Sequence, residues 1–345
     1  MFKSRLSRTV RILCFLLALN ASCGAYPQWG LSERQGRRSS MEDEAVILAL
    51  KLNTHVPKAF LFGVFDGHGG SQASKYAAQK IGSAFTMCFN ELSPLYSSFD
   101  DLIRLSYLVS FNALDQVIKN LYRSDGSTAL SALVTPNEVY LSWIGDSRGL
   151  VLNADGRIKC STIDHKPDSP KELARYGNGS ILIRQHVVEN KSGRSFYKPQ
   201  RFGQQFHLEQ GEKVLDVGPW RLGPLSLSRA LGDHEVKNVQ PLIIADSETI
   251  KVLIEHDDIV ILACDGVWDV MSNEDVAKLV TESQELELEK LESLYPELTD
   301  DDEQGFEYED GSDLKMKLVA RAIRDKSYEL GSGDNLSVLV IKIKK

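Results

Sequence analysis

The stretch LFGVFDGHGG, residues 61–70, joins five apolar or small residues to Asp66, a glycine, a histidine and two more glycines. The apolar run predicts a buried strand, and the glycines predict a tight turn directly after it. The carboxylate of Asp66 and the imidazole of His68 are therefore expected where a strand ends. A polar turn that caps the strand and a loop that carries chemistry to the edge of a sheet both fit this stretch taken alone.

Other acidic residues occupy equivalent positions, directly before, after or between strand-like runs. They are Glu42, Asp43, Asp146, Asp265, Asp269 and Asp334. Any one of them alone is most simply a turn residue, because Asp and Gly populate turns. Taken together they predict a cluster at a common sheet edge. Several ionised carboxylates cannot crowd together without compensating positive charge, so a divalent metal is expected.

The type of ligand points to the metal. Oxygen ligands without a His/Cys cluster favour the hard ions Mg²⁺ or Mn²⁺ over Zn²⁺. A calcium loop is the rival interpretation, but the D-x-D-x-D-G spacing that such loops need is absent.

The pattern of elements indicates an α+β fold. Short strand-like runs cover residues 45–50, 59–65, 127–134, 138–144, 149–153, 242–246, 258–264 and 336–343. Helical patterns cover residues 71–90, 99–121, 170–176, 272–294 and 313–330. Strands in runs, with helices in separate blocks and turn signals between strands, favour antiparallel sheets layered with helices.

Composition and charge limit the possible functions. The net charge is −8 and 42% of the residues are hydrophobic, which is typical of a globular protein and gives no support to a nucleic-acid binder. The acidity is local, because residues 282–313 hold fourteen acids and one lysine. Two segments look inserted, a flap at 185–220 and an acidic loop at about 295–312. Such a like-charge run predicts a solvated loop, and docking of a basic partner is the alternative.

The N-terminal segment has the order of a signal peptide. Four basic residues and no acid fall in residues 1–25, the apolar run ILCFLLAL covers 12–19, and small residues follow. We expect cleavage near Ala25, which leaves residues 26–345 as the mature domain. An apolar N-terminal helix or an uncleaved anchor is the alternative. The three widely spaced cysteines that remain predict neither a disulfide framework nor a metal cluster.

The motifs together resemble the metal-dependent Ser/Thr protein phosphatases of type 2C, the PPM family. The matching stretches occur in the family's order from about Arg37 to the C-terminus: RRSSMEDE, FGVFDGHGG, GSTA, IGDSRG, DHKP, LSLSRALGD, ACDGVWDVMS and SGDNLSVLVI. The resemblance implies a four-layer α-β-β-α sandwich, in which two antiparallel sheets are flanked by helices on both faces. It places the acidic residues in a cleft at one end of that sandwich.

The resemblance also implies a role for each site residue. Asp66 bridges two Mn²⁺ or Mg²⁺ ions and Gly67 offers its carbonyl oxygen to one. Glu42 ligates one ion, while Asp265 and Asp334 ligate the other. Asp43 and Asp269 orient metal-bound water, and Asp146 with Asp265 matches a weaker third metal site. Arg38 binds the substrate phosphate, and His68 is the general acid.

These roles imply direct in-line hydrolysis of phosphoserine and phosphothreonine by an activated water, with no phosphoenzyme. Asp155, Asp233, Arg148 and Arg229 are interpreted as structural, and Cys264 as a core filler. The flap departs from the common form of the family in being longer, and its basic residues suggest that it helps to select substrates.

The implied partners are phosphoprotein substrates of a monomeric enzyme, with no nucleic acid and no stable membrane association after signal cleavage. The N-terminal segment predicts the secretory pathway or secretion, including delivery into another cell. Cytoplasm or nucleus is the alternative if that segment is not a signal. Two rival functions stay open: a pseudophosphatase that serves as a binding module, and a two-metal phosphoesterase that acts on nucleotides or small phosphates.

Overall fold

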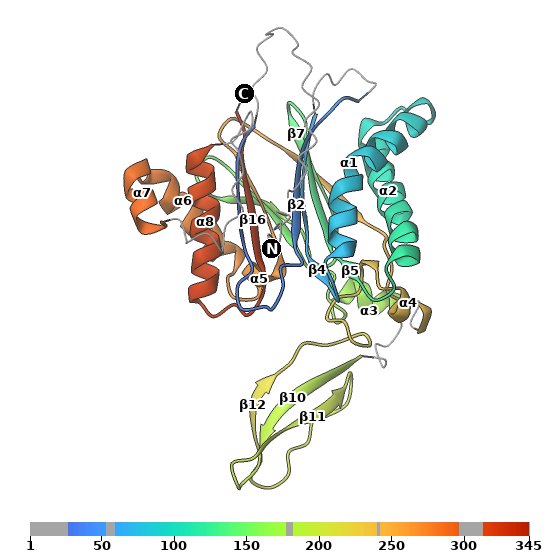
Figure 1. Cartoon of the computed structure of the whole chain (residues 1–345), viewed down its shortest axis with the longest axis vertical. Helices are drawn as coiled ribbons and strands as arrows, with labels where there is room; N and C mark the ends of the chain where they lie inside the picture. Colours follow the sequence, from blue (N-terminus) through green and yellow to red (C-terminus); the bar gives the residue numbers. More distant parts are fainter. Residues whose placement is uncertain (1–26, 53–58, 177–181, 240–241, 297–312, 345) are drawn as a thin grey trace, which may run out of the picture.

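The computed structural model describes residues 27–52, 59–176, 182–239, 242–296 and 313–344. Two five-stranded antiparallel sheets face each other at its centre, and helices cover both outer faces (Figure 1). The four-layer α-β-β-α arrangement expected from the resemblance is therefore confirmed. The predicted signal segment 1–25 and residues 297–312 of the predicted acidic loop lie outside the described residues.

The first sheet has the strand order β1-β16-β15-β8-β9. Its strands are β1 (Gln28–Arg34), β16 (Leu336–Lys342), β15 (Ile259–Ala263), β8 (Arg148–Leu152) and β9 (Ile158–Ser161). The second sheet has the order β14-β7-β6-β3-β2. Its strands are β14 (Glu248–Leu253), β7 (Glu138–Ile144), β6 (Ala129–Val134), β3 (Ala59–Phe65) and β2 (Glu44–Leu50).

The helices form the two outer layers. On one side lie α1 (Gln72–Leu92) and α2 (Phe99–Leu121), joined by the 3₁₀ turn η1 (Ser93–Leu95). On the other lie α5 (Asp265–Trp268), α6 (Asn273–Glu285), α7 (Leu288–Leu294) and α8 (Leu314–Glu329). Two short helices, α3 (Pro170–Tyr176) and α4 (His234–Val239), sit below α2 in Figure 1.

Three apolar clusters hold the layers together, one between the sheets and one under each helical layer. The continuously apolar sequence of β3 follows from its position between two of these clusters. Leu61 and Phe65 pack under α1 and α2, whereas Phe62 and Val64 pack between the sheets. A strand covered on both faces needs apolar residues at every position, and Asp66 is the first residue after this strand.

Most of the predicted elements are confirmed, and α2 begins and ends at the predicted residues. Its first turn carries Asp100 and Asp101, and the Ser98 side chain accepts a hydrogen bond from the Asp101 amide, which caps the helix. The helix predicted at 272–294 instead breaks at Leu286 and Glu287, whose backbones are extended. The Lys315 ammonium of α8 donates to the Gln284 and Leu286 carbonyl oxygens, so α8 caps the end of α6.

Other differences concern strands, because the sequence did not predict β1, β9 and β14. The prediction of a strand at 242–246 is wrong, because only an isolated bridge between Ile244 and Arg229 forms there. The predicted flap segment contains a separate antiparallel sheet, with strand order β11-β10-β12, that extends from the sandwich (Figure 1). Its strands are β10 (Ile183–Glu189), β11 (Ser195–Arg201) and β12 (Lys213–Val217).

Candidate metal centre and active site

The predicted acidic residues converge at one end of the sandwich. The strand registers set this end, because the C-termini of β3, β7 and β15 lie beside the N-termini of β2, β6, β8 and β16. Each of these termini borders a loop that carries an acid. Asp43, Asp66 and Cys264 offer ligand atoms within 4.8 Å of one another.

The carboxylates lie close enough to perturb one another. Burial raises the pKa of Asp66 well above its ordinary value, and the charges of Asp43, Asp146 and Asp334 raise it further. Burial also raises the pKa of Asp265 well above its ordinary value, with Asp66, Asp146 and Asp269 acting in the same direction. The carboxylates therefore oppose one another's ionisation, and added positive charge would favour their ionised forms.

The surroundings of Asp43 indicate whether the residues at the acidic end suit a metal ion. Its side chain is 3% exposed, and neither carboxylate oxygen has a hydrogen-bond partner. Burial is the largest cause that raises the pKa of Asp43 to about 7, and the charges of Asp334 and Asp265 act in the same direction. The nearby Ser337 hydroxyl and Cys264 thiol oppose this rise without cancelling it. A buried carboxylate without a partner is costly, and a divalent cation with its water shell satisfies such a group. The donor set is almost entirely carboxylate oxygen, which suits Mg²⁺ or Mn²⁺.

Gly67 allows two loops to pack closely at the site. A Cβ atom at this position would overlap the carbonyl oxygen of Glu42. The Ser74 hydroxyl of α1 donates to the same carbonyl oxygen at 2.5 Å. Close packing of this kind demands glycine and fixes the backbone of Glu42 beside that of Asp66.

The loop that carries Arg38 and Glu42 is fastened by Asn335. The amide nitrogen of Asn335 donates to the carbonyl oxygens of Gln35 and Ser40, at 2.7 and 2.9 Å. Its amide oxygen accepts from the backbone N–H of Glu42 at 2.9 Å. Asn335 follows Asp334 in the chain, so one dipeptide supplies a predicted ligand and holds the loop that supplies another.

Two adjacent arginines on this loop have different environments. Arg37 donates to the carbonyl oxygen of Ser332 at 2.9 Å and lies over the ring of Tyr328. The side chain of Arg38 is 58% exposed and pairs with Asp334 at 2.6 Å. Arg38 is thus the arginine that reaches the acidic end, as the resemblance implies.

His68 lies on a small sheet beside the acidic end and pairs with Asp233. Its Nε2 lies 3.0 and 2.9 Å from the two carboxylate oxygens of Asp233. Burial lowers the pKa of His68, but the charge and hydrogen bond of Asp233, with Asp146 and Glu42, outweigh burial and raise it. Asp233, which the sequence suggests is structural because it stands beside a glycine, is thus a partner of the predicted general acid.

Lys166 is a second residue that the sequence interpretation missed. Its ammonium pairs with Asp146, the acid of the predicted third metal site. Burial lowers the pKa of Lys166, but the charges of Asp146, Asp265 and Asp269 raise it overall. Lys166 belongs to the DHKP motif, and that motif was the only signal in the sequence that could have drawn attention to it.

The residues interpreted as structural otherwise keep that role. Arg148 forms a bidentate pair with Asp164. Arg229 pairs with the fully buried Glu172. Asp155 is exposed in a turn, where its backbone N–H donates to Asn153. Cys264 is buried as predicted, but its thiol also belongs to the cluster around Asp43 and Asp66.

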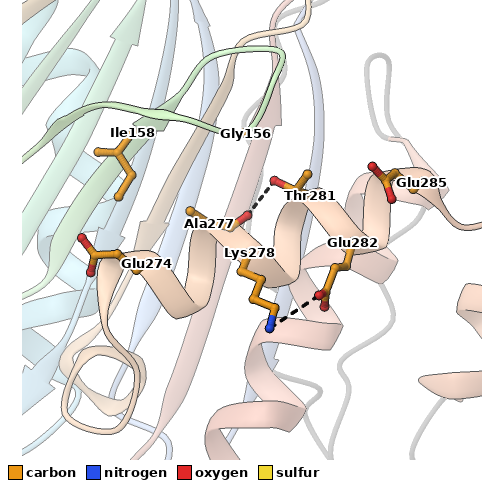
Figure 2. A pocket seen from close by; sticks show the side chains of 8 residues that line it. All are labelled: Gly156, Ile158, Glu274, Ala277, Lys278, Thr281, Glu282 and Glu285. Atoms are coloured by element: carbon orange, nitrogen blue, oxygen red, sulfur yellow. Dashed lines mark hydrogen bonds and ion pairs between the residues drawn. The ribbon is translucent and has the colours of Figure 1, made fainter.

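A separate hollow lies on the outer helical layer. Its volume is about 470 Å³. Figure 2 shows its lining residues on the β8–β9 turn at Gly156 and on α6. Glu274, Glu282 and Glu285 line it, but none of the predicted site residues does. The candidate site is therefore the acidic end of the sandwich and not this hollow.

Comparison with solved structures identifies the fold. A structure titled "Structure of a C.elegans sex determining protein" matches with a TM-score of 0.61 and 24% identity, over 92% of this chain and 65% of that one. A structure titled "Crystal structure of serine-threonine phosphatase 2C from Toxoplasma gondii" matches with a TM-score of 0.57 and 18% identity, over 95% and 98%.

Comparison of sequences identifies the family. The chain is 28% identical over 322 residues to "Probable protein phosphatase 2C 76" of Arabidopsis thaliana, covering 91% of this chain and 59% of that protein. It is 29% identical over 345 residues to "Protein phosphatase 1B" of Bos taurus, covering 91% and 56%. The chain spans little more than half of the length of these two relatives. A family model described as Protein phosphatase 2C matches residues 28–336, and the chain therefore belongs to the protein phosphatase 2C family.

Proposed function

We propose that this chain is a metal-dependent protein serine/threonine phosphatase. The observation that carries the proposal is the buried carboxylate of Asp43, which has no hydrogen-bond partner and lies among the acids of the strand ends. Family membership supports the same reaction class. A pseudophosphatase that serves only as a binding module has no need to retain this destabilising cluster.

The proposed metal ligands are Asp66, the Gly67 carbonyl, Glu42, Asp265 and Asp334, with Asp43 and Asp269 orienting water and Asp146 at a weaker third site. Two Mn²⁺ or Mg²⁺ ions held there would supply the Lewis acidity that activates water for direct attack on phosphorus. The chain's own contribution is rigidity. Asn335, Ser74 and the glycine at 67 fix the loop backbones from which the acids project.

Arg38 and His68 complete the proposed reaction. The exposed guanidinium of Arg38 offers charge-assisted hydrogen bonds to the non-transferred phosphate oxygens. His68 donates a proton to the serine or threonine oxygen as it leaves. Because water attacks directly, no phosphoenzyme forms on this pathway.

A comparison of substrates tests this function. We expect the purified chain to release phosphate from a phosphothreonine peptide with Mn²⁺ present and to lose that activity in excess chelator. The same preparation is given nucleoside monophosphates and small sugar phosphates. A preference for these small substrates would favour the rival phosphoesterase, whereas metal binding without turnover of any substrate would favour a binding module.

The flap is proposed to select phosphoprotein substrates, and its sheet suggests how to shorten it by removing β11 and the adjoining loops. Glu189 and Lys213 are the last paired residues of β10 and β12. Replacing residues 190–212 by Asn-Gly therefore joins these strands through a two-residue hairpin turn. We expect this variant to change kcat/KM for phosphoproteins while activity on an aryl phosphate stays intact. Equal losses on both substrates would contradict the role.

Because of the N-terminal segment, we propose that the chain enters the secretory pathway. Asn335 begins an N-glycosylation sequon, which enzymes of that pathway can modify. We expect Asn335 to remain unmodified, because it is 4% exposed and its amide nitrogen donates two hydrogen bonds. Intact-mass and glycopeptide analysis of protein from a secreting cell tests this. A glycan on Asn335 in folded, active protein would refute the proposed packing of the loop.

A further inference from the structure

Three very short strands join the motifs around the proposed general acid. They are β4 (Gly67–His68), β5 (Gly126–Ser127) and β13 (Leu231–Gly232), and β5 is in the middle. His68 and Gly232 are both paired with Gly126, one from each side. The residue after β13 is Asp233, so this small sheet brings it opposite His68.

Gly126 leaves the space in which the pair forms. A Cβ atom at Gly126 would overlap both Nε2 of His68 and Oδ2 of Asp233. The imidazole and the carboxylate therefore meet over the bare backbone of the middle strand. Any other residue at this position would have to displace one of the two side chains.

Asp233 is held in an unfavourable state that the pairing explains. Its carboxylate is 2% exposed, and its φ of +56° lies in the left-handed region. Both features cost free energy, although Asp tolerates this backbone region better than most residues. Within the part of the chain that the structure describes, His68 is the only side chain recorded within hydrogen-bond distance of this carboxylate.

We infer that Asp233 is the positioning residue for His68: it holds the ring through Nε2 and thereby presents Nδ1 to the leaving group. This inference rests on the proposed function and on the geometry of the three short strands. Since Asp233 accepts from Nε2–H, the other ring nitrogen is the one that faces the reaction.

The proton transfer is then defined atom by atom. The oxygen of the attacking water forms the new bond to phosphorus while the bond to the serine or threonine oxygen breaks. The electron pair of the breaking bond stays on that leaving oxygen, and the proton on Nδ1 moves to it. The neutral ring that results still donates from Nε2–H to Asp233.

Leaving-group dependence separates this role from general structural support. A poor leaving group such as threonine needs the proton, whereas 4-nitrophenolate leaves readily without it. We expect Asp233→Asn to lower kcat for a phosphothreonine peptide by about tenfold to a hundredfold, within the range of general acid catalysis. Activity on 4-nitrophenyl phosphate should change by less than about threefold, because its leaving group needs no proton from His68.

A double variant that combines Asp233→Asn with His68→Gln tests whether the two residues act together. If Asp233 acts only through His68, adding Asp233→Asn to His68→Gln causes no further loss. Gly126→Ala should reproduce the same selective loss by pushing the ring away from the carboxylate. Asp257→Asn is the matched control, because Asp257 has the only other positive φ at a non-glycine residue described and pairs instead with Lys344. This control should leave both activities unchanged.

A spectroscopic readout tests the pairing without turnover. In ¹⁵N-labelled protein we expect His68 to show a carboxylate-bonded Nε2–H that is lost in Asp233→Asn. A ring bonded through Nδ1, equal losses on the two substrates, or a further loss in the double variant would each overturn the inference. If the wild type hydrolyses neither substrate, the proposed function fails, and the ring spectrum still decides the pairing.

Discussion

Replacing Asp265 by alanine is expected to lower kcat for a phosphothreonine peptide by at least about a thousand-fold in Mn²⁺, about 4 kcal/mol of transition-state stabilisation. Asp265 opens α5 and is separated from the end of β15 only by Cys264, so its position is fixed from both sides. Its charge interacts with those of Asp66 and Asp146, which places it inside the cluster. Steady-state kinetics across a range of Mn²⁺ concentrations measures the effect.

Unfolding of the variant does not account for such a loss, because the buried carboxylate of Asp265 destabilises the metal-free fold. Burial and its acidic neighbours raise its pKa well above the ordinary value, so removal of the group should not lower the metal-free melting temperature. Asp155→Ala is the control, since Asp155 is exposed in a turn. A variant of Asp265 that retains more than about a tenth of the wild-type kcat would contradict the proposed site.

The second large effect is on stability and comes from Asp43. Its pKa is about 7 in the folded chain against an ordinary value of 3.8. Between these two values the folded state keeps a proton that the unfolded state releases. The free energy of unfolding of the metal-free protein therefore falls as pH rises from about 4 to about 7, by a few kcal/mol from this group alone.

Asp43→Asn isolates that contribution. In chelator at pH 8 we expect the variant to be more stable than the wild type, and the difference to vanish near pH 4, where Asp43 is neutral in both states. Saturating Mn²⁺ should reverse the order, because the wild type gains more binding free energy. Denaturant titrations at several pH values measure this. A wild type that is more stable than the variant at pH 8 in chelator would show that Asp43 is not an unpaired carboxylate.

Much of the site could be predicted because its residues flank long apolar runs. The strand ending at Phe65 is covered on both faces, which makes its sequence unmistakable and places Asp66 at its end. The same logic applies to Asp265 after β15 and Asp334 before β16. Local sequence carries this information, since burial on both faces leaves a continuous apolar run.

What could not be predicted depends on contacts between distant segments. Asp233 looks like a turn residue beside a glycine, and only the pairing of β4, β5 and β13 brings it to His68. Lys166 reaches Asp146 across a loop. The break between α6 and α7 depends on Lys315 of another helix. None of these contacts leaves a periodic pattern in the sequence.

The most direct test of the proposed site is anomalous X-ray scattering from crystals of the chain grown or soaked with Mn²⁺. We expect two strong manganese peaks at the acidic end of the sandwich, both beside the carboxylate of Asp66. Glu42 should lie near one peak, and Asp265 and Asp334 near the other. Peaks elsewhere on the molecule, or none near Asp66 at a concentration that supports activity, would contradict it.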